Sequence, residues 1–248
     1  MSFKTLLIFV LLVAVLAGAG ALGFRYLPNL DQLGARVSTP TVGGQCADCH
    51  RRDSVAIVHQ FEGSRHAGSG VTCIDCHQPV EGQEQYDHRG IALARNVTPL
   101  NCAQCHAAEY REYLRSRHAA PAWAAVTGPA DFTEEQVQFA ESLHPGTIRR
   151  DSKQLAALEG SPVMTAGCKA CHDVGRPNPD GSIGSCIDCH TAHSDSIALA
   201  RHPDTCAQCH TGAGQIGADI YRESRHGLLF EAGLADMNLA DHSRDLGV

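Results

Sequence analysis

The chain has 248 residues, carries a formal net charge of −7 and contains only 5% aromatic residues. This acidic balance argues against a nucleic-acid partner, because surfaces that bind nucleic acid are basic. This aromatic content is low for the hydrophobic core of a chain this long. We therefore expect a bound group to supply part of the apolar bulk.

The N-terminus combines Lys4 with a run of twenty uncharged residues that ends before Arg25. A basic start followed by an apolar run is typical of an export signal. The run is long enough to span a bilayer, yet its end is rich in small residues, which are typical of a cleavage site. We therefore expect residues 1–25 to form a hydrophobic helix that is either a cleaved signal peptide or a membrane anchor. Residues 26–248 are then a domain in the periplasm or on the outer face of the cytoplasmic membrane.

All twelve cysteines lie in six C-x-x-C-H units. This spacing is the attachment signal for c-type haem, in which both cysteines form thioethers and the adjacent histidine binds the iron. Structural zinc or disulfides would also use paired cysteines, but neither requires a histidine after every second cysteine. The sequence therefore predicts six covalently attached haem c groups. The cysteine pairs are Cys46 and Cys49, Cys73 and Cys76, Cys102 and Cys105, Cys168 and Cys171, Cys186 and Cys189, and Cys206 and Cys209, and the adjacent (proximal) histidines are His50, His77, His106, His172, His190 and His210.

Nine of the fifteen histidines stand outside these units, whereas the chain has only three methionines. Ligation by histidine and methionine is therefore not general here, and we expect irons bound by two histidines, at low potential. Three near-copies of one phrase, "FEGSRHAG", "YLRSRHAA" and "YRESRHGL", each place a histidine five residues after an aromatic residue. The predicted second (distal) ligands are His66, His118 and His226 in these phrases, His193 just after the fifth unit, and His88 between the second and third units.

The arginine before each repeated histidine is Arg65, Arg117 or Arg225. These arginines either neutralise haem propionates or face water, and the sequence leaves both readings open. Five distal ligands for six irons leave one iron with an open position. The fourth unit, "CKACH", is the expected open site, because no S-R-H or C-H-x-x-H phrase accompanies it.

We expect a mainly α-helical chain with extensive loops, organised around stacked haems and without a sheet. The sequence predicts helices in residues 109–126, with a break at Pro121, and in residues 218–234. A third helix is expected to begin at a T-x-x-Q capping box formed by Thr133 and Gln136. The stretch "GRPNPDGSIGS" is typical of a loop.

The stretch "CKACHDVGRPNPDGSIGSCIDCHTAHSDSIALARHPDTCAQCHTGAGQIGADIYRESRHG" closely resembles the core of the hydroxylamine oxidoreductase family of octahaem cytochromes c. The earlier "FEGSRHAGSGVTCIDCHQPVEGQ" and "NCAQCHAAEYREYLRSRHAAPAW" resemble its N-terminal haem region, so the match covers nearly all of residues 46–240. The resemblance implies that the haem of Cys168, Cys171 and His172 is a five-coordinate active site. It also implies chemistry on hydroxylamine, nitrite or hydrazine, electron passage along the other haems, and a homotrimer.

Two departures separate the chain from this family. Family members carry a "GPDH"-like phrase after the sixth haem unit, with an acid-base pair, whereas this chain reads "GAGQ", with Gly214 and Gln215 in those places. Neither side chain titrates usefully. The sequence also ends near the point where family members continue into two more haem units, so it is either a six-haem form or a truncated one.

Two functions therefore stay open. The first is electron transfer between a redox partner, such as a cytochrome or a quinone-linked membrane complex, and another protein. The second is oxidoreduction of hydroxylamine, nitrite or a related small nitrogen compound at the haem of His172. The missing acid-base pair favours electron transfer, whereas the missing distal ligand favours catalysis.

Overall fold

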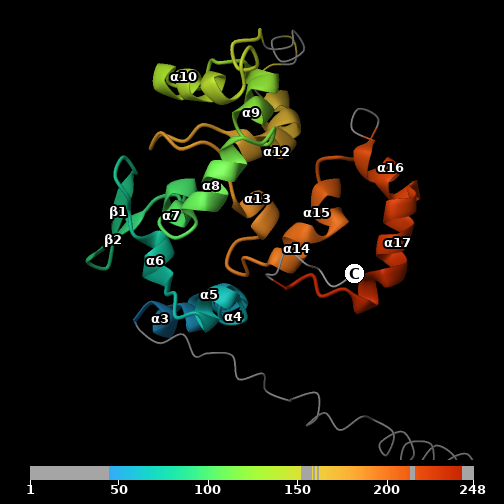
Figure 1. The fold of residues 1–248 in the computed structure, drawn as a ribbon. Helices are drawn as coiled ribbons and strands as arrows, with labels where there is room; N and C mark the ends of the chain where they lie inside the picture. Colours follow the sequence, from blue (N-terminus) through green and yellow to red (C-terminus); the bar gives the residue numbers. More distant parts are fainter. Residues whose placement is uncertain (1–44, 152–157, 159, 161, 213–215, 242–248) are drawn as a thin grey trace, which may run out of the picture. The chain divides into compact units, whose positions relative to one another are not determined.

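Short helices joined by loops make up most of residues 45–151, 158, 160, 162–212 and 216–241, the part of the chain that the computed structural model describes (Figure 1). The expected mainly helical class is confirmed. The predicted hydrophobic helix of residues 1–25 lies outside the described residues, as do Gly214 and Gln215. Within the described part, no helix is both long enough and apolar enough to cross a membrane.

In the described part of the chain before the fourth C-x-x-C-H unit, short helices surround two short antiparallel strands. The helices are α3 (Gln45–Asp53), α4 (Val55–Glu62), α5 (Arg65–Gly68), α6 (Cys73–His77), α7 (Pro99–Ala103), α8 (Ala107–Leu114), α9 (Ala120–Thr127) and α10 (Glu134–Leu143). From the fourth unit onward the elements are the π-helix η1 (Met164–Cys168), α12 (Lys169–His172), η2 (Asp173–Gly175), α13 (Ile187–His190), α14 (Ile197–Arg201), α15 (Pro203–Ala207), α16 (Gly217–Glu223), α17 (Arg225–Gly233) and η3 (Leu234–Asp236).

Two of the helices expected from the sequence are each divided in two. Residues 109–126 form α8 and α9, and the interruption lies just before Pro121, which occupies the first turn of α9. Proline fits there because the first helical N–H groups have no intrahelical acceptor. Residues 218–234 form α16 and α17, which are separated by Ser224 in an extended conformation. The capping box of Thr133 and Gln136 is confirmed, with Gln136 N donating to Thr133 Oγ1 at 3.2 Å.

The serine of the repeated S-R-H phrase has a structural role that the sequence analysis did not assign. Ser64 caps α5, and its Oγ accepts from Ala67 N at 3.2 Å. Ser224 caps α17 in the same way, accepting from Gly227 N at 3.2 Å. In the middle copy, Ser116 Oγ accepts from the N–H of His118 itself, also at 3.2 Å. The serine therefore fixes the backbone that carries the histidine in each copy.

The expectation that no sheet forms was wrong, because β1 (Gln85–His88) and β2 (Ile91–Ala94) pair in an antiparallel hairpin. His88 pairs with Ile91, so the turn is Arg89 and Gly90, with φ of 58° and 83°. Positive φ at both turn residues matches the right-handed twist of a hairpin. All of β1 is exposed, so this strand lacks the apolar alternation by which strands are recognised.

Two small clusters of buried apolar side chains lie within the described residues. The larger joins α8, α9 and α10 to the loop after η2, and the smaller joins α3, α4 and α5. The members of the larger cluster are Leu114, Ala120, Trp123, Ala124, Phe132, Val137, Ala140, Ile148 and Ile183, and those of the smaller are Ala47, Phe61 and Ala67. These clusters are modest for the described part of the chain, and a bound group would add apolar bulk to them.

Candidate functional site: histidine pairs among the C-x-x-C-H units

Each C-x-x-C-H unit is folded into about one helical turn. His106 N donates to Cys102 O at 2.9 Å, and the same bond recurs at 3.1 Å between His190 and Cys186. A helical turn brings residues three and four positions apart to one face. Both cysteines and the histidine of a unit therefore address the same side, as attachment to one porphyrin requires.

Four of the six proximal histidines lie opposite one of the predicted distal histidines. The ring centroids are separated by 6.2 Å for His50 and His88, 5.9 Å for His106 and His66, 6.4 Å for His77 and His193, and 5.9 Å for His210 and His118. Each pair joins segments that are distant in the sequence. Sequence reasoning named the members of these pairs but did not say which belonged together.

These separations fit one metal ion between each pair of rings. Imidazole nitrogen binds metals at about 2 Å, and the ring centroid lies about 1 Å behind that nitrogen, so two rings on opposite sides of a metal have centroids about 6 Å apart. The observed range of 5.9 to 6.4 Å matches this span. Direct packing of two histidines would not require four pairs to share this one separation.

The angle between the rings divides the four pairs into two kinds. The ring planes are near-parallel for His50 and His88, at 27°, and for His77 and His193, at 12°. They are near-perpendicular in the other two pairs, at 65° and 79°. Both arrangements are compatible with two ligands on one iron, but they produce different electronic states of the ferric iron.

His118 is positioned by close packing against the segment that follows the fourth unit. The Tyr113 hydroxyl donates to His118 O at 3.0 Å and to Val174 O. Burial raises the pKa of this hydroxyl, so it keeps its proton for these bonds. Glycine is required at two contacts, because a Cβ at Gly175 would overlap Ala119 O and one at Gly184 would overlap the Tyr113 ring. The aromatic residue of the repeated phrase thus holds the histidine five positions later.

The fourth unit differs from the others in its local structure. It is entered through the π-helix η1, a rare form that is frequent at functional sites. His172 Nδ1 lies 2.5 Å from Ala122 O, which fixes the ring and leaves Nε2 for a metal. Lys169 covers the Trp123 ring, with Nζ 4.7 Å from its centroid. Among the described residues, no histidine ring lies opposite His172.

The fifth unit also lacks a facing histidine in the described part of the chain. The sequence analysis had predicted this only for the fourth unit. His226 correspondingly faces no proximal histidine there, although α17 presents it much as α5 presents His66. Two other histidines have structural partners. His144 is buried, with Nε2 2.9 Å from Leu114 O, and His202 caps α15.

The attachment cysteines of different units lie in contact. The thiols of Cys102 and Cys186, from the third and fifth units, lie close together. Cys171 and Cys209, from the fourth and sixth units, make a similar contact, with Cys209 Sγ 3.9 Å from Cys171 O. Units separated in the sequence are therefore neighbours in space, which no local pattern indicates.

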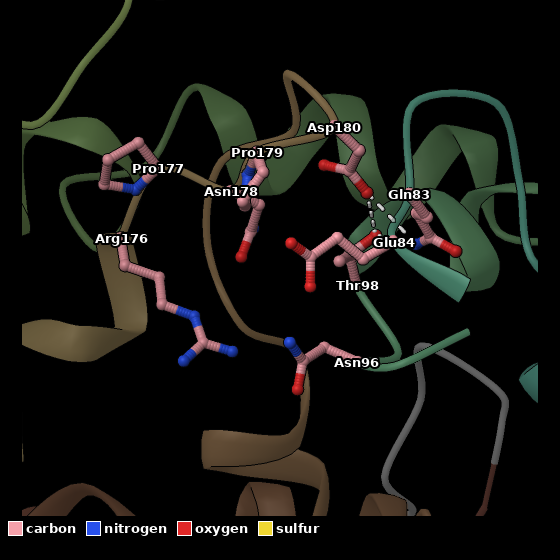
Figure 2. Close-up of a pocket in the computed structure, with 9 residues that line it drawn as sticks. All are labelled: Gln83, Glu84, Asn96, Thr98, Arg176, Pro177, Asn178, Pro179 and Asp180. Carbon is pink, nitrogen blue, oxygen red and sulfur yellow. Dashed lines mark hydrogen bonds between the residues drawn. The ribbon is translucent and has the colours of Figure 1, made fainter. Parts of the chain in front are cut away.

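A cavity of about 220 Å³, lined mostly by polar residues, lies beside the loop that follows η2 (Figure 2). Arg176 lines both this cavity and a smaller one that contains Cys102 and Cys186. Its Nη1 bonds Asp173 Oδ2 at 3.2 Å, but its buried Nε has no acceptor within the described residues. An unsatisfied guanidinium nitrogen beside two attachment cysteines fits an anionic group such as a haem propionate.

The opposite side of this cavity is a closed hydrogen-bond network around Asp180. Its carboxylate accepts from Thr98 Oγ1 at 2.6 Å, Ser182 Oγ at 2.7 Å and Gln83 Nε2 at 3.0 Å. Burial acts to raise the pKa of Asp180, but these bonds outweigh it and hold the pKa below its usual range. Because Gln83 also bonds Asn101 Oδ1 at 2.7 Å, the network fixes the start of α7, and with it Cys102, to the loop that leads to Cys186.

A mainly helical chain in which C-x-x-C-H units face a second set of histidines is, as a class, a multihaem c-type cytochrome. Comparison with known proteins agrees: the chain belongs to the family described as "Seven times multi-haem cytochrome CxxCH", which matches residues 69–244. Membership of this family means that haem c is covalently bound, as the spacing predicted.

The chain is also similar to individual proteins. A "Probable nitrite reductase-hydroxylamine oxidoreductase fusion protein" of Kuenenia stuttgartiensis is 24% identical over 222 residues, which cover 75% of this chain and 22% of that protein. A solved "Hypothetical multiheme protein" has a TM-score of 0.61 at 22% identity, covering 86% of this chain and 51% of that one. A reducing HAO-like protein complex of Kuenenia stuttgartiensis has a TM-score of 0.51 at 24% identity, with coverage of 79% and 37%.

The predicted resemblance to hydroxylamine oxidoreductase-like multihaem cytochromes is thus confirmed. The chain spans about half, or less, of the length of these relatives, at 51%, 37% and 22%. The overall length and assembly of these relatives therefore do not establish those of this chain.

Proposed function

We propose that this protein is an extracytoplasmic six-haem cytochrome that transfers electrons, with at least four of its irons bound by two histidines. One observation carries the proposal: four proximal histidines each face a distal histidine across the span of one iron. The ligands are His50 with His88, His77 with His193, His106 with His66, and His210 with His118.

Histidines on both sides of an iron leave it no position for a substrate. The haem supplies one-electron chemistry when bound, and the chain's own groups set its ligands, orientation and surroundings. The contacts between Cys102 and Cys186 and between Cys171 and Cys209 favour closely spaced haems. Such spacing suits a chain of electron carriers better than a set of isolated cofactors.

A second candidate function is oxidoreduction of hydroxylamine, nitrite or a related small nitrogen compound at the haem of His172. Two observations favour it: no described histidine faces His172, and the π-helix η1 marks the fourth unit as distinct. The acid-base pair of the family is replaced by Gly214 and Gln215, so proton transfer needs another donor. Electron transfer through the remaining haems is required in either case.

The proposed location and partners follow from the chemistry of the sequence. Attachment of haem c takes place outside the cytoplasm, and the apolar run before Arg25 has the composition of an export signal or anchor. The partners are then redox proteins, such as another cytochrome or a quinone-linked membrane complex. Assembly into a homotrimer is proposed from the family resemblance alone.

The test is electron paramagnetic resonance (EPR) of the purified ferric protein, combined with a measured haem-to-protein ratio, before and after addition of hydroxylamine. Six haems with mostly low-spin signals support the electron-transfer proposal. A high-spin signal that shifts with hydroxylamine adds the catalytic function. A ratio well below six, or mainly high-spin iron, refutes the proposed ligation.

A further inference from the structure

The turn that follows the fifth unit holds three non-glycine residues in the left-handed region. Thr191 has φ of 38°, His193 of 69° and Asp195 of 42°. This conformation is uncommon outside glycine and is an outlier for β-branched threonine. Such strain persists only where the surrounding structure imposes it, and it concentrates at functional sites. Asp195 N closes the turn by donating to Thr191 O at 2.9 Å.

The strained turn presents two side chains to two different histidine pairs. His193 faces His77 of the second unit. Asp195 Oδ2 lies 3.2 Å from Nδ1 of His66, the histidine that faces His106 of the third unit. Both members of this contact are largely shielded, with 29% and 33% of the Asp195 and His66 side chains exposed. The carboxylate therefore meets the ring nitrogen that an iron-bound imidazole leaves free.

We propose that Asp195 lowers the reduction potential of the third-unit haem by accepting a hydrogen bond from His66 Nδ1. The inference rests on the proposed ligation of that iron by His106 and His66. A carboxylate bonded to the outer nitrogen of a ligating imidazole fixes the ring and raises its basicity. A more basic ligand stabilises Fe(III) over Fe(II). With haem bound, a neighbouring carrier would supply the electron, and the hydrogen bond between His66 and Asp195 would be kept in both oxidation states.

The position of Asp195 gives it an influence on more than one unit. The carboxylate lies near Cys76 of the second unit, Cys102 of the third, and Cys186 and His190 of the fifth. Within the described residues, His66 is the predicted ligand that bonds Asp195 directly. Asp195 therefore lowers the reduction potential most at the third haem and less at the second and fifth. In this way one carboxylate makes the potentials of neighbouring haems differ.

The experiment is a spectroscopic redox titration of the holoprotein and of its Asp195→Asn variant. Asparagine has the same shape and tolerates the left-handed conformation, so the turn is preserved while the charge is lost. We expect the equilibrium at the third haem to shift about tenfold from Fe(III) toward Fe(II). This corresponds to a rise of about 59 mV in the reduction potential of that haem. Glu134→Gln is the control, because it removes a surface carboxylate whose described partners are Gln138 and Arg149 and include no histidine.

Two further variants make the outcomes decisive. Asp195→Gly also removes the acceptor but relieves the backbone strain. We expect this variant, like Asp195→Asn, to have a raised reduction potential at the third haem. A purely structural role for Asp195 predicts no shift in Asp195→Gly. His66→Ala should turn the third haem high-spin in EPR. If His66→Ala gives that signal while both Asp195 variants match the Glu134→Gln control, the inference about Asp195 is wrong and the electron-transfer proposal stands. If His66→Ala leaves every low-spin signal unchanged, the proposed ligation itself fails.

Discussion

Removal of the Tyr113 hydroxyl tests how the structure positions His118. In Tyr113→Phe, the backbone carbonyls of His118 and Val174 both lose the proton that they share. Removing one partner costs about 1–3 kcal/mol when the remaining acceptor is buried, but here one bond is exposed and the other part-buried. We therefore expect the free energy of unfolding to fall by about 1 kcal/mol, the lower end of that range. The histidine five residues later loses its backbone anchor at the same time.

The assay combines guanidinium unfolding with EPR, and Tyr110→Phe is a matched control. The Tyr110 hydroxyl also bonds a backbone in the same cluster, accepting from Ile183 N at 3.0 Å, but it does not contact His118. Both variants should lose stability, whereas only Tyr113→Phe should alter the low-spin signal of the haem bound by His118 and His210. Identical EPR spectra for the two variants would refute the argument that Tyr113 orients His118.

The remaining predictions concern the ring angles, a buried carboxylate and the fourth unit. The two near-perpendicular histidine pairs should give low-spin EPR signals with larger maximum g values than the two near-parallel pairs, because perpendicular ligand planes leave two iron d orbitals nearly degenerate; four signals of one kind would contradict the angles. Because the folded pKa of Asp180 is lowered, its contribution to stability is present above the unfolded value of about 3.9 and is lost as the pH falls through the folded pKa. Unfolding of Asp180→Asn should therefore depend less on pH at the acid end, with reduced stability at neutral pH; an unchanged acid profile would count against the network. Cys168→Ser should reduce covalent attachment at the fourth unit, so an unchanged haem-to-protein ratio and haem stain would contradict that assignment.

The candidate haem-binding residues could be named from the sequence because their signal is local. C-x-x-C-H is a fixed spacing, and the S-R-H phrase repeats an aromatic residue, a serine and a histidine at constant intervals. The pairing of His77 with His193 could not be predicted in this way, since it depends on how distant segments pack. The same limit applies to the contact between Cys102 and Cys186.

Two structural features had signals too weak or too unusual to be recognised. The exposed strand β1 has no apolar alternation, so only Arg89 and Gly90 indicated a turn, and the hairpin that carries His88 was missed. The role of Asp195 depends on a left-handed backbone in a threonine-containing turn, which residue preferences argue against. In both cases the backbone conformation departs from the preference of its own residues, and a histidine that faces a proximal histidine lies in the same segment.

The long separations between paired histidines bear on how the protein is made. On the proposed ligation and export, the chain crosses the membrane with its N-terminus first. His77 is then exported well before His193, the histidine after the fifth unit that faces it. His106, by contrast, finds His66 already delivered. A haem attached at the second unit would therefore lack its distal histidine until His193 is exported. During this time its iron could bind an external ligand, which the proposed ligation in the mature protein prevents.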